Sequence, residues 1–136
     1  MKVASLAVSV GVVAVGFLLA AGSARADAKQ DAANEEMMQA AGRLVFHRCQ
    51  ACHALDPSIN AFGPALHGVV GRKAGTVPRF EYSEAMRKSG ITWTEDKLRQ
   101  WIADNEKTVP GTRMRHVAIS DVAEQDYLIA YIKSLK

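Results

Sequence analysis

The chain has 136 residues, of which 49% are hydrophobic and 23% are charged, and it carries a formal net charge of +3 at pH 7. This length corresponds to one domain, and the hydrophobic content excludes a disordered chain. Two cysteines are too few for a small domain held together by disulfides, and the small net charge argues against a nucleic-acid-binding protein with a strong basic surface.

The first 26 residues have the layout of a bacterial secretory signal peptide. Lys2 precedes an uncharged run from Val3 to Ala24, and Ala24 and Ala26 lie at the two positions that a signal peptidase reads. An uncleaved membrane anchor is the alternative, because about 20 apolar residues can span a bilayer. Both alternatives place the rest of the chain outside the cytoplasm, and we expect it in the periplasm. Residues 27–41 would then form an acidic leader with the start of the first helix, and residues 42–136 the domain.

Four segments have helical patterns, and none shows the sustained alternation that is typical of a strand. The first carries apolar side chains three and four residues apart, and the next two begin at residues that favour the N-cap. The apolar residues of the first segment are Met37, Ala40, Ala41, Leu44 and Val45. The four segments are residues 33–47, residues 83–89 with Ser83 as the cap, residues 94–104 with Thr94 as the cap, and a last helix that begins near Ser120.

Two long loops, Ala54–Tyr82 and Asn105–Ile119, separate these predicted helices. Loops longer than ~12–15 residues are uncommon in compact domains unless they are functional or are held in place. A chain of this size with two such loops buries little apolar surface by itself. We therefore expect a bound group to fill the interior.

The pentapeptide Cys49-Gln50-Ala51-Cys52-His53 is typical of a covalent haem c site. Thiols three residues apart lie on one side of a helical turn, where both can form thioethers with neighbouring haem vinyl groups. The adjacent imidazole is then placed to reach the iron. A redox-active dithiol usually follows a strand, and zinc needs about four ligands, so both alternatives are weaker, as is chance occurrence.

A second axial ligand would distinguish an electron carrier from an open haem site. Met114 is the leading candidate, because it follows a Pro-Gly turn within a long loop and lies far enough beyond His53 to reach the other side of a haem. For the remaining methionines, packing in the core is the alternative to binding iron. The remaining histidines are better explained by hydrogen bonding or lie where they are poorly placed to reach the iron. These residues are Met37, Met38, Met86, His47, His67 and His116.

From Gly42 to Lys136 the chain resembles the class I cytochromes c, in the branch of mitochondrial cytochrome c and its bacterial periplasmic relatives. The matching pieces occur in the family's order. They are Gly42 and Phe46, the Cys49–His53 pentapeptide, Gly63–Gly68, Gly71–Lys73, Phe80–Ala85, Gly90–Trp93, Pro110–Met114 and Leu128–Tyr131. The resemblance implies an all-α protein with the small cytochrome c fold, in which about four helices and long loops wrap around one covalently bound haem.

The resemblance also implies the residues of the haem site. His53 and Met114 would be the two axial ligands of one haem c, which Cys49 and Cys52 would bind covalently. The carbonyl of Pro64 would accept a hydrogen bond from the other ring nitrogen of His53, a contact that orients the ligand.

Four further residues would support the cofactor by the same resemblance. Arg72, Tyr82 and Trp93 would hold the buried haem propionate, and Thr112 would support the loop that carries the methionine ligand. For Tyr82 and Trp93, core packing is compatible with this role, because buried Tyr and Trp need a partner for their polar atom. The chain departs from the mitochondrial pattern at His116, the one residue able to compete for the iron if the methionine let go.

Iron held on both faces has no vacant position, so we expect a one-electron carrier and not an enzyme. The expected partners are redox proteins, among them respiratory or photosynthetic membrane complexes, with no nucleic acid. We expect a monomer that touches the membrane only transiently unless residues 1–26 are retained. The alternative function is a peroxidase or gas-binding protein with a labile Met114. Positive charge that would steer acidic partners comes from Arg72, Lys73, Arg113 and Arg115.

Overall fold

The computed structural model describes residues 15–136, so the first 14 residues of the predicted signal peptide lie outside it. The chain divides into two units, one that ends at Asn34 and one that runs from Glu35 to Lys136. Within the described residues, no helix combines the length and apolar character needed to cross a bilayer. The cleavage predicted after residue 26 stays a prediction.

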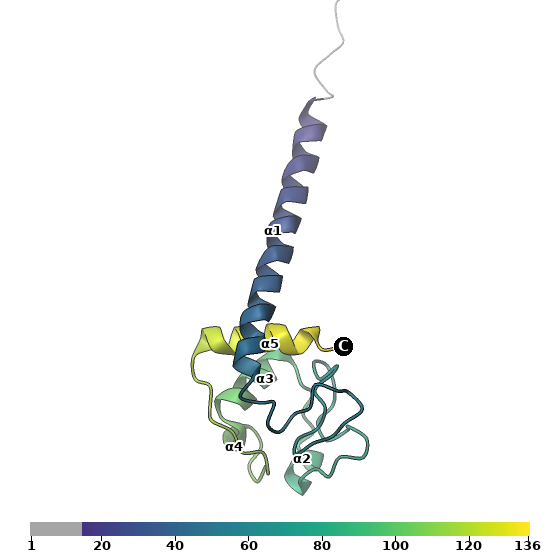
Figure 1. The fold of residues 1–136 in the computed structure, drawn as a ribbon, viewed down its shortest axis with the longest axis vertical. Helices are drawn as coiled ribbons and strands as arrows, with labels where there is room; N and C mark the ends of the chain where they lie inside the picture. The colour runs from purple at the N-terminus through teal and green to yellow at the C-terminus, as the bar shows by residue number, and fades with distance from the viewer. Residues whose placement is uncertain (1–14) are drawn as a thin grey trace, which may run out of the picture. The chain divides into compact units, whose positions relative to one another are not determined.

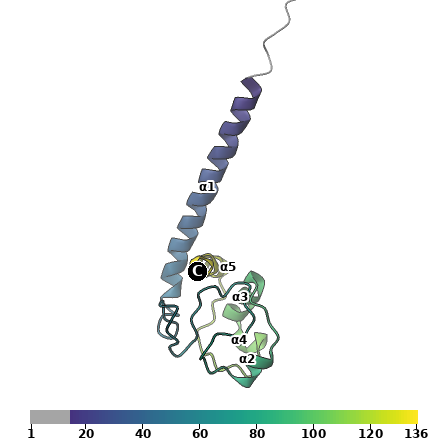
Figure 2. The same cartoon turned by 90° about the vertical axis from the view of Figure 1, so that its right-hand side faces the viewer.

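Five helices form the described part of the chain (Figures 1 and 2). Outside the named helices, the only β pairing within residues 15–136 is an isolated bridge between Lys73 and Thr92. The prediction of an all-α protein is therefore confirmed, with five helices in place of about four. In chain order they are α1 (Val15–Phe46), α2 (Glu84–Lys88), α3 (Glu95–Ala103), α4 (Asn105–Thr108) and α5 (Val122–Ser134).

Helix α1 begins well before the predicted residue 33. The segment from Ala24 to Ala41 is rich in alanine and contains neither glycine nor proline, so it has a high intrinsic helix propensity. Side-chain hydrogen bonds of 3.0 Å four residues apart, from Gln30 to Asn34 and from Gln39 to Glu35, add local support. The predicted acidic leader is therefore helical.

The buried face of α1 also differs from the prediction. Met37 and Leu44 belong to the predicted apolar face but are 65% and 71% exposed, whereas Gly42, Val45 and Phe46 are buried. The reason is the crossing with α5, which Figures 1 and 2 show at the C-terminal end of α1. A Cβ atom on Gly42 would lie 1.9 Å from the backbone oxygen of Tyr127, so the glycine sets which face meets α5.

The predicted caps of α2 and α3 are confirmed. Oγ of Ser83 accepts a hydrogen bond from the N–H of Met86 at 3.2 Å, and Oγ1 of Thr94 accepts one from the N–H of Lys97 at 3.1 Å. Each bond satisfies a backbone donor that the first turn of a helix leaves without an internal partner.

Helix α4 lies inside the segment Asn105–Ile119 that the sequence predicts as a loop, so that prediction is wrong over four residues. Asp104 ends α3 through its backbone N–H, which donates to the carbonyl of Gln100, and its carboxylate caps α4 by accepting a hydrogen bond from the N–H of Lys107 at 2.9 Å. The last helix is capped by Asp121, one residue after the predicted start at Ser120, through the N–H of Glu124 at 2.9 Å.

Backbone hydrogen bonds hold the long loop before α2 in place. The N–H of Gly71 donates to the carbonyl of Trp93 at 2.8 Å, and the N–H of Trp93 donates to the carbonyl of Arg72 at 2.9 Å. The N–H of Gly68 donates to the carbonyl of Leu135 at 2.8 Å. The loop is thereby attached to the segment before α3 and to the end of α5.

The core lies where α1, α3 and α5 meet. Phe46, Leu128 and Ile129 are its most completely buried large side chains. The rings of Trp93 and Trp101 pack edge to face with centroids 5.2 Å apart, a favourable aromatic geometry. This core fixes the end of α1, where the cysteine motif begins, relative to the loops on either side of α2.

We predict that Gly42→Ala destabilises the protein by about 1–3 kcal/mol, because the neighbouring backbone of Tyr127 cannot yield as a flexible side chain would. Chemical denaturation of the haem-loaded protein measures the effect. The matched control is Leu44→Ala on the same helix, which is exposed and should change the free energy of unfolding by less than about 0.5 kcal/mol. Equal effects of the two variants would contradict the close helix crossing.

Candidate functional site

The cysteine motif forms a tight turn directly after α1. The N–H of Cys49 donates to the carbonyl of Phe46 at 2.8 Å, and the N–H groups of Cys52 and His53 both donate to the carbonyl of Cys49, at 3.0 and 2.9 Å. Both cysteines are free thiols, Cys49 half-buried and Cys52 exposed. Burial raises the pKa of the Cys49 thiol, and the positive charge of Arg48 opposes this shift. The turn therefore presents two thiols and an imidazole within five residues.

The His53 ring is buried, and its orientation is fixed by the loop that follows. Nδ1 lies 2.7 Å from the carbonyl oxygen of Pro64. Because a carbonyl only accepts hydrogen bonds, Nδ1 must carry the proton, which leaves the lone pair of the neutral ring on Nε2. Burial lowers the pKa of His53 below its usual value, and the bond to Pro64 opposes the shift. A neutral, oriented imidazole of this kind is suited to bind a metal.

Gly63 lies against the face of this imidazole. A Cβ atom at this position would lie 2.5 Å from Cε1 and 2.8 Å from Nδ1 of His53. The N–H of Gly63 also donates to the carbonyl of Cys52 at 2.7 Å. The glycine therefore closes the loop onto the cysteine turn and leaves just enough room for the ring.

Two side chains hold the backbone around Met114. Oγ1 of Thr112 lies 3.4 Å from the N–H of Met114, and the Thr112 side chain is buried. Nδ2 of Asn105 donates to the carbonyl of Met114 at 2.6 Å. Sequence reasoning did not find this role of Asn105, because a four-residue helix such as α4 has no periodic signal. The Met114 side chain is partly buried against the core cluster that contains Trp101.

The turn before Met114 is held from the same helix. The N–H of Gly111 donates to the Glu106 carboxylate at 2.9 Å, and Gly111 has a φ of 83°, which favours glycine. Helix α4 thus supports the predicted Pro-Gly turn through Glu106 and the Met114 backbone through Asn105.

Arg72 is linked to Trp93 through a backbone hydrogen bond and to Tyr82 through its charge. The guanidinium of Arg72 donates to the carbonyls of His67 at 2.8 Å and Ala65 at 3.0 Å, so it also organises the long loop. Burial raises the pKa of Tyr82, and the Arg72 charge opposes that shift. The backbone of Trp93 bonds to the backbone of Arg72. Sequence reasoning missed the loop carbonyls as partners of Arg72.

The other candidate ligands fall into two groups. Met86 is buried in the core, as the packing alternative predicts, while Met37 is exposed and Met38 is half-buried on α1. Among the described residues, the two buried side-chain nitrogens without a hydrogen-bond partner are Nδ1 of His67 and Nδ1 of His116.

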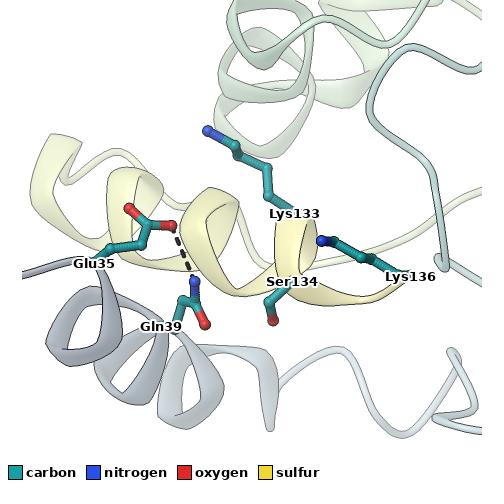
Figure 3. Close-up of a pocket in the computed structure, with 5 residues that line it drawn as sticks. All are labelled: Glu35, Gln39, Lys133, Ser134 and Lys136. Carbon is teal, nitrogen blue, oxygen red and sulfur yellow. Dashed lines mark hydrogen bonds between the residues drawn. The ribbon is translucent and has the colours of Figure 1, made fainter. Parts of the chain in front are cut away.

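An open cleft of about 420 Å³ lies between α1 and α5, as Figure 3 shows. Glu35 and Gln39 line it from α1, and Lys133 and Ser134 from α5, with Lys136 beyond the helix. None of the predicted haem-site residues lines this cleft. The structure therefore keeps it separate from the cysteine motif and the Met114 segment.

The chain is similar to known proteins in both sequence and structure. The cytochrome c family model matches residues 39–136. Cytochrome c2 of Blastochloris viridis is 44% identical over 118 residues, covering 86% of this chain and 87% of that protein. Cytochrome c type-1 of Ascaris suum is 40% identical over 93 residues, covering 68% and 83%. The solved structure of cytochrome cH from Methylobacterium extorquens is 47% identical with a TM-score of 0.66, covering 70% of this chain and 96% of that one.

We predict that Gly63→Ala lowers the yield of covalently haem-loaded protein and its melting temperature, because the added methyl group forces the His53 ring out of position. Intact mass and thermal denaturation measure the two effects. Ala61→Ser, an exposed change two residues earlier in the same loop, is the matched control and should leave both unchanged. Normal loading of the Gly63 variant would show that the ring does not need this contact.

Proposed function

The chain belongs to the class I cytochrome c family, and on that premise we propose that His53 and Met114 are the axial ligands of its haem iron. The protein is a mono-haem electron carrier and not an enzyme, with its haem c bound covalently through Cys49 and Cys52. Its partners are redox proteins. The haem iron supplies one-electron redox chemistry when bound.

The hydrogen bond between Nδ1 of His53 and the carbonyl of Pro64 is the observation that carries the proposal. It leaves the Nε2 lone pair free on a ring that burial keeps neutral. A metal-ligating histidine commonly donates its other ring N–H to a carbonyl in this way, which fixes its tautomer and orientation. His53 thus meets the chemical requirement for the proximal ligand.

The assignment of the distal ligand to Met114 is supported by how firmly its backbone is held. Thr112 contacts its N–H and Asn105 contacts its carbonyl, so the thioether projects from a segment that is positioned at both backbone polar atoms. A methionine ligand raises the reduction potential relative to stronger electron donors. With His53 and Met114 both bound to the iron, no coordination position would be left for a substrate.

We also propose that Arg72, Tyr82 and Trp93 hold the buried haem propionate. The guanidinium of Arg72 is partly buried, and burial lowers its pKa, so an anionic neighbour would be favourable there. Tyr82 lies close enough for its ionisation to depend on the Arg72 charge. The three residues would present one positive group and two neutral donors to a carboxylate.

The proposed setting is the periplasm, where the mature chain acts as a monomer. Its redox partners would be respiratory or photosynthetic membrane complexes, touched only transiently. Exposed basic side chains lie on both sides of Met114, at Arg113 and Arg115. Such positive charge near the Met114 segment would steer encounter with acidic partners, and high salt would weaken that effect.

We predict that Met114→Ala abolishes the weak near-infrared sulfur–iron absorption band of the oxidised protein and lowers its reduction potential. Absorption spectroscopy and redox titration measure both. Met86→Ala is the matched control, because Met86 is a buried core residue of α2. It should retain the band while losing about 2–5 kcal/mol of stability. Retention of the band in the Met114 variant would identify a different ligand.

We predict that the mature exported protein begins at Asp27 and carries the added mass of one haem. The small residues before Asp27 motivate this division into a signal peptide of residues 1–26, a leader of residues 27–41 and a domain of residues 42–136. Intact mass spectrometry of the protein purified from the periplasm decides it. A product that still begins at Met1 would instead indicate a membrane-tethered carrier.

A further inference from the structure

The chain around Met114 alternates between inward and outward side chains. Residues 113–120 form no helix or strand, and burial alternates along them. Thr112 is buried and Met114 and His116 are half-buried, whereas the intervening Arg113 and Arg115 are exposed. An extended backbone points side chains i and i+2 to the same side. His116 is therefore the next inward-facing side chain after Met114.

The imidazole of His116 has one nitrogen engaged and one unused. Nε2 lies 3.1 Å from the carbonyl oxygen of Ile102 in α3 and must donate to it, because a carbonyl only accepts. Nδ1 is buried and has no partner among the described residues. With the proton on Nε2, the neutral ring carries its lone pair on Nδ1. Like His53, His116 has one nitrogen that donates to a backbone carbonyl and one that carries a free lone pair. The free nitrogen is Nε2 in His53 and Nδ1 in His116.

The segment that carries His116 is attached mainly at its ends. Asn105 holds the carbonyl of Met114 at one end, and the N–H of Ile119 donates to the carbonyl of Ile102 at 2.9 Å at the other. Between these points, residues 115–118 make no backbone–backbone hydrogen bond to any residue that the structure describes, and the hydrogen bond from the His116 side chain to Ile102 is the one that a shift of the stretch would break. A backbone with so few bonds shifts at little cost. For His116 to occupy the place of the Met114 side chain, the extended backbone would have to shift by about 7 Å along its own direction.

We propose that His116 is a reserve ligand, whose Nδ1 takes the sixth coordination position of the haem iron whenever the Met114 thioether leaves it. The proposal rests on the ligation by His53 and Met114 proposed above. The exchange breaks one iron–sulfur coordinate bond and the hydrogen bond from Nε2 of His116 to the carbonyl of Ile102, and it forms one iron–nitrogen coordinate bond. It moves no proton and no electron, because thioether and neutral imidazole each donate one lone pair.

The consequence is that loss of Met114 does not open the haem to small molecules. A haem protein with one vacant axial position can bind gases, whereas one whose sixth position is refilled from the same chain resists them. The apparent affinity for an added ligand is proportional to the fraction of molecules in which the sixth position is free. The reserve ligand would therefore keep this chain an electron carrier and prevent the gas-binding behaviour that a labile methionine otherwise allows.

The test compares four haem-loaded proteins at one neutral pH: the unaltered chain, Met114→Ala, Met114→Ala with His116→Phe, and Met114→Ala with His67→Phe. The last is the matched control, since His67 also has a buried Nδ1 without a partner among the described residues. Electron paramagnetic resonance of the oxidised proteins reports the spin state and ligand type, and carbon monoxide titration of the reduced proteins reports access. If the phenylalanine variant does not fold, His116→Gln keeps an N–H donor for the carbonyl of Ile102.

We expect Met114→Ala to be low-spin with two nitrogen ligands, and removal of His116 to make it high-spin. Carbon monoxide should bind the variant that retains His116 at least about tenfold more weakly, which corresponds to occupation of the sixth position by His116 in about nine molecules of ten. The His67 control should behave like Met114→Ala alone.

Two results would overturn the reserve ligand. One is a high-spin Met114→Ala protein that binds carbon monoxide as tightly as the variant lacking His116. The other is a low-spin state that persists after His116 is replaced. In both cases an unaltered chain with the sulfur–iron band leaves the His53–Met114 ligation standing, whereas an unaltered chain without that band contradicts the proposed function itself.

Discussion

The hydrogen bond from Nδ1 of His53 to the carbonyl of Pro64 is the contact on which the site depends. It joins the turn after α1 to a loop that would otherwise have few attachments near the cysteines. Gly63, immediately before Pro64, lies against the ring and bonds to the backbone of Cys52. One imidazole therefore has its proton, its lone pair and its ring plane set by two consecutive loop residues.

The segment that carries Met114 depends on the carbonyl of Ile102 in α3. It accepts the N–H of Ile119 and the Nε2–H of His116, and so attaches the end of the Met114 segment to α3. Helix α4 supplies the other attachments through Asn105 and Glu106. The backbone of the segment is thus held at Met114 and at Ile119, and between them the His116 side chain is attached to α3. Such an arrangement is compatible with the proposal that this segment supplies an iron ligand and can replace it.

Signals that act within a few residues were predictable. Ser83 and Thr94 cap their helices as expected, because an N-cap bond reaches only two or three residues ahead. Signals that depend on a distant partner were not. Of the residues predicted to form the apolar face of α1, Val45 is buried but Met37 and Leu44 are exposed, since the approach of α5 to Gly42 decides which face is buried. The four-residue α4 was missed because so short a helix has no periodicity.

The sequence by itself determined the chemistry of attachment, because two thiols and an imidazole within five consecutive residues cannot be separated by any fold. It also determined the helical character of the chain, through alanine content, apolar spacing and caps. Only the tertiary structure decided which nitrogen of His53 is free, which side chains hold Met114, and that His116 has an unused buried nitrogen. These properties arise from contacts between residues far apart in the chain, such as His116 and Ile102, whose distance no local pattern encodes.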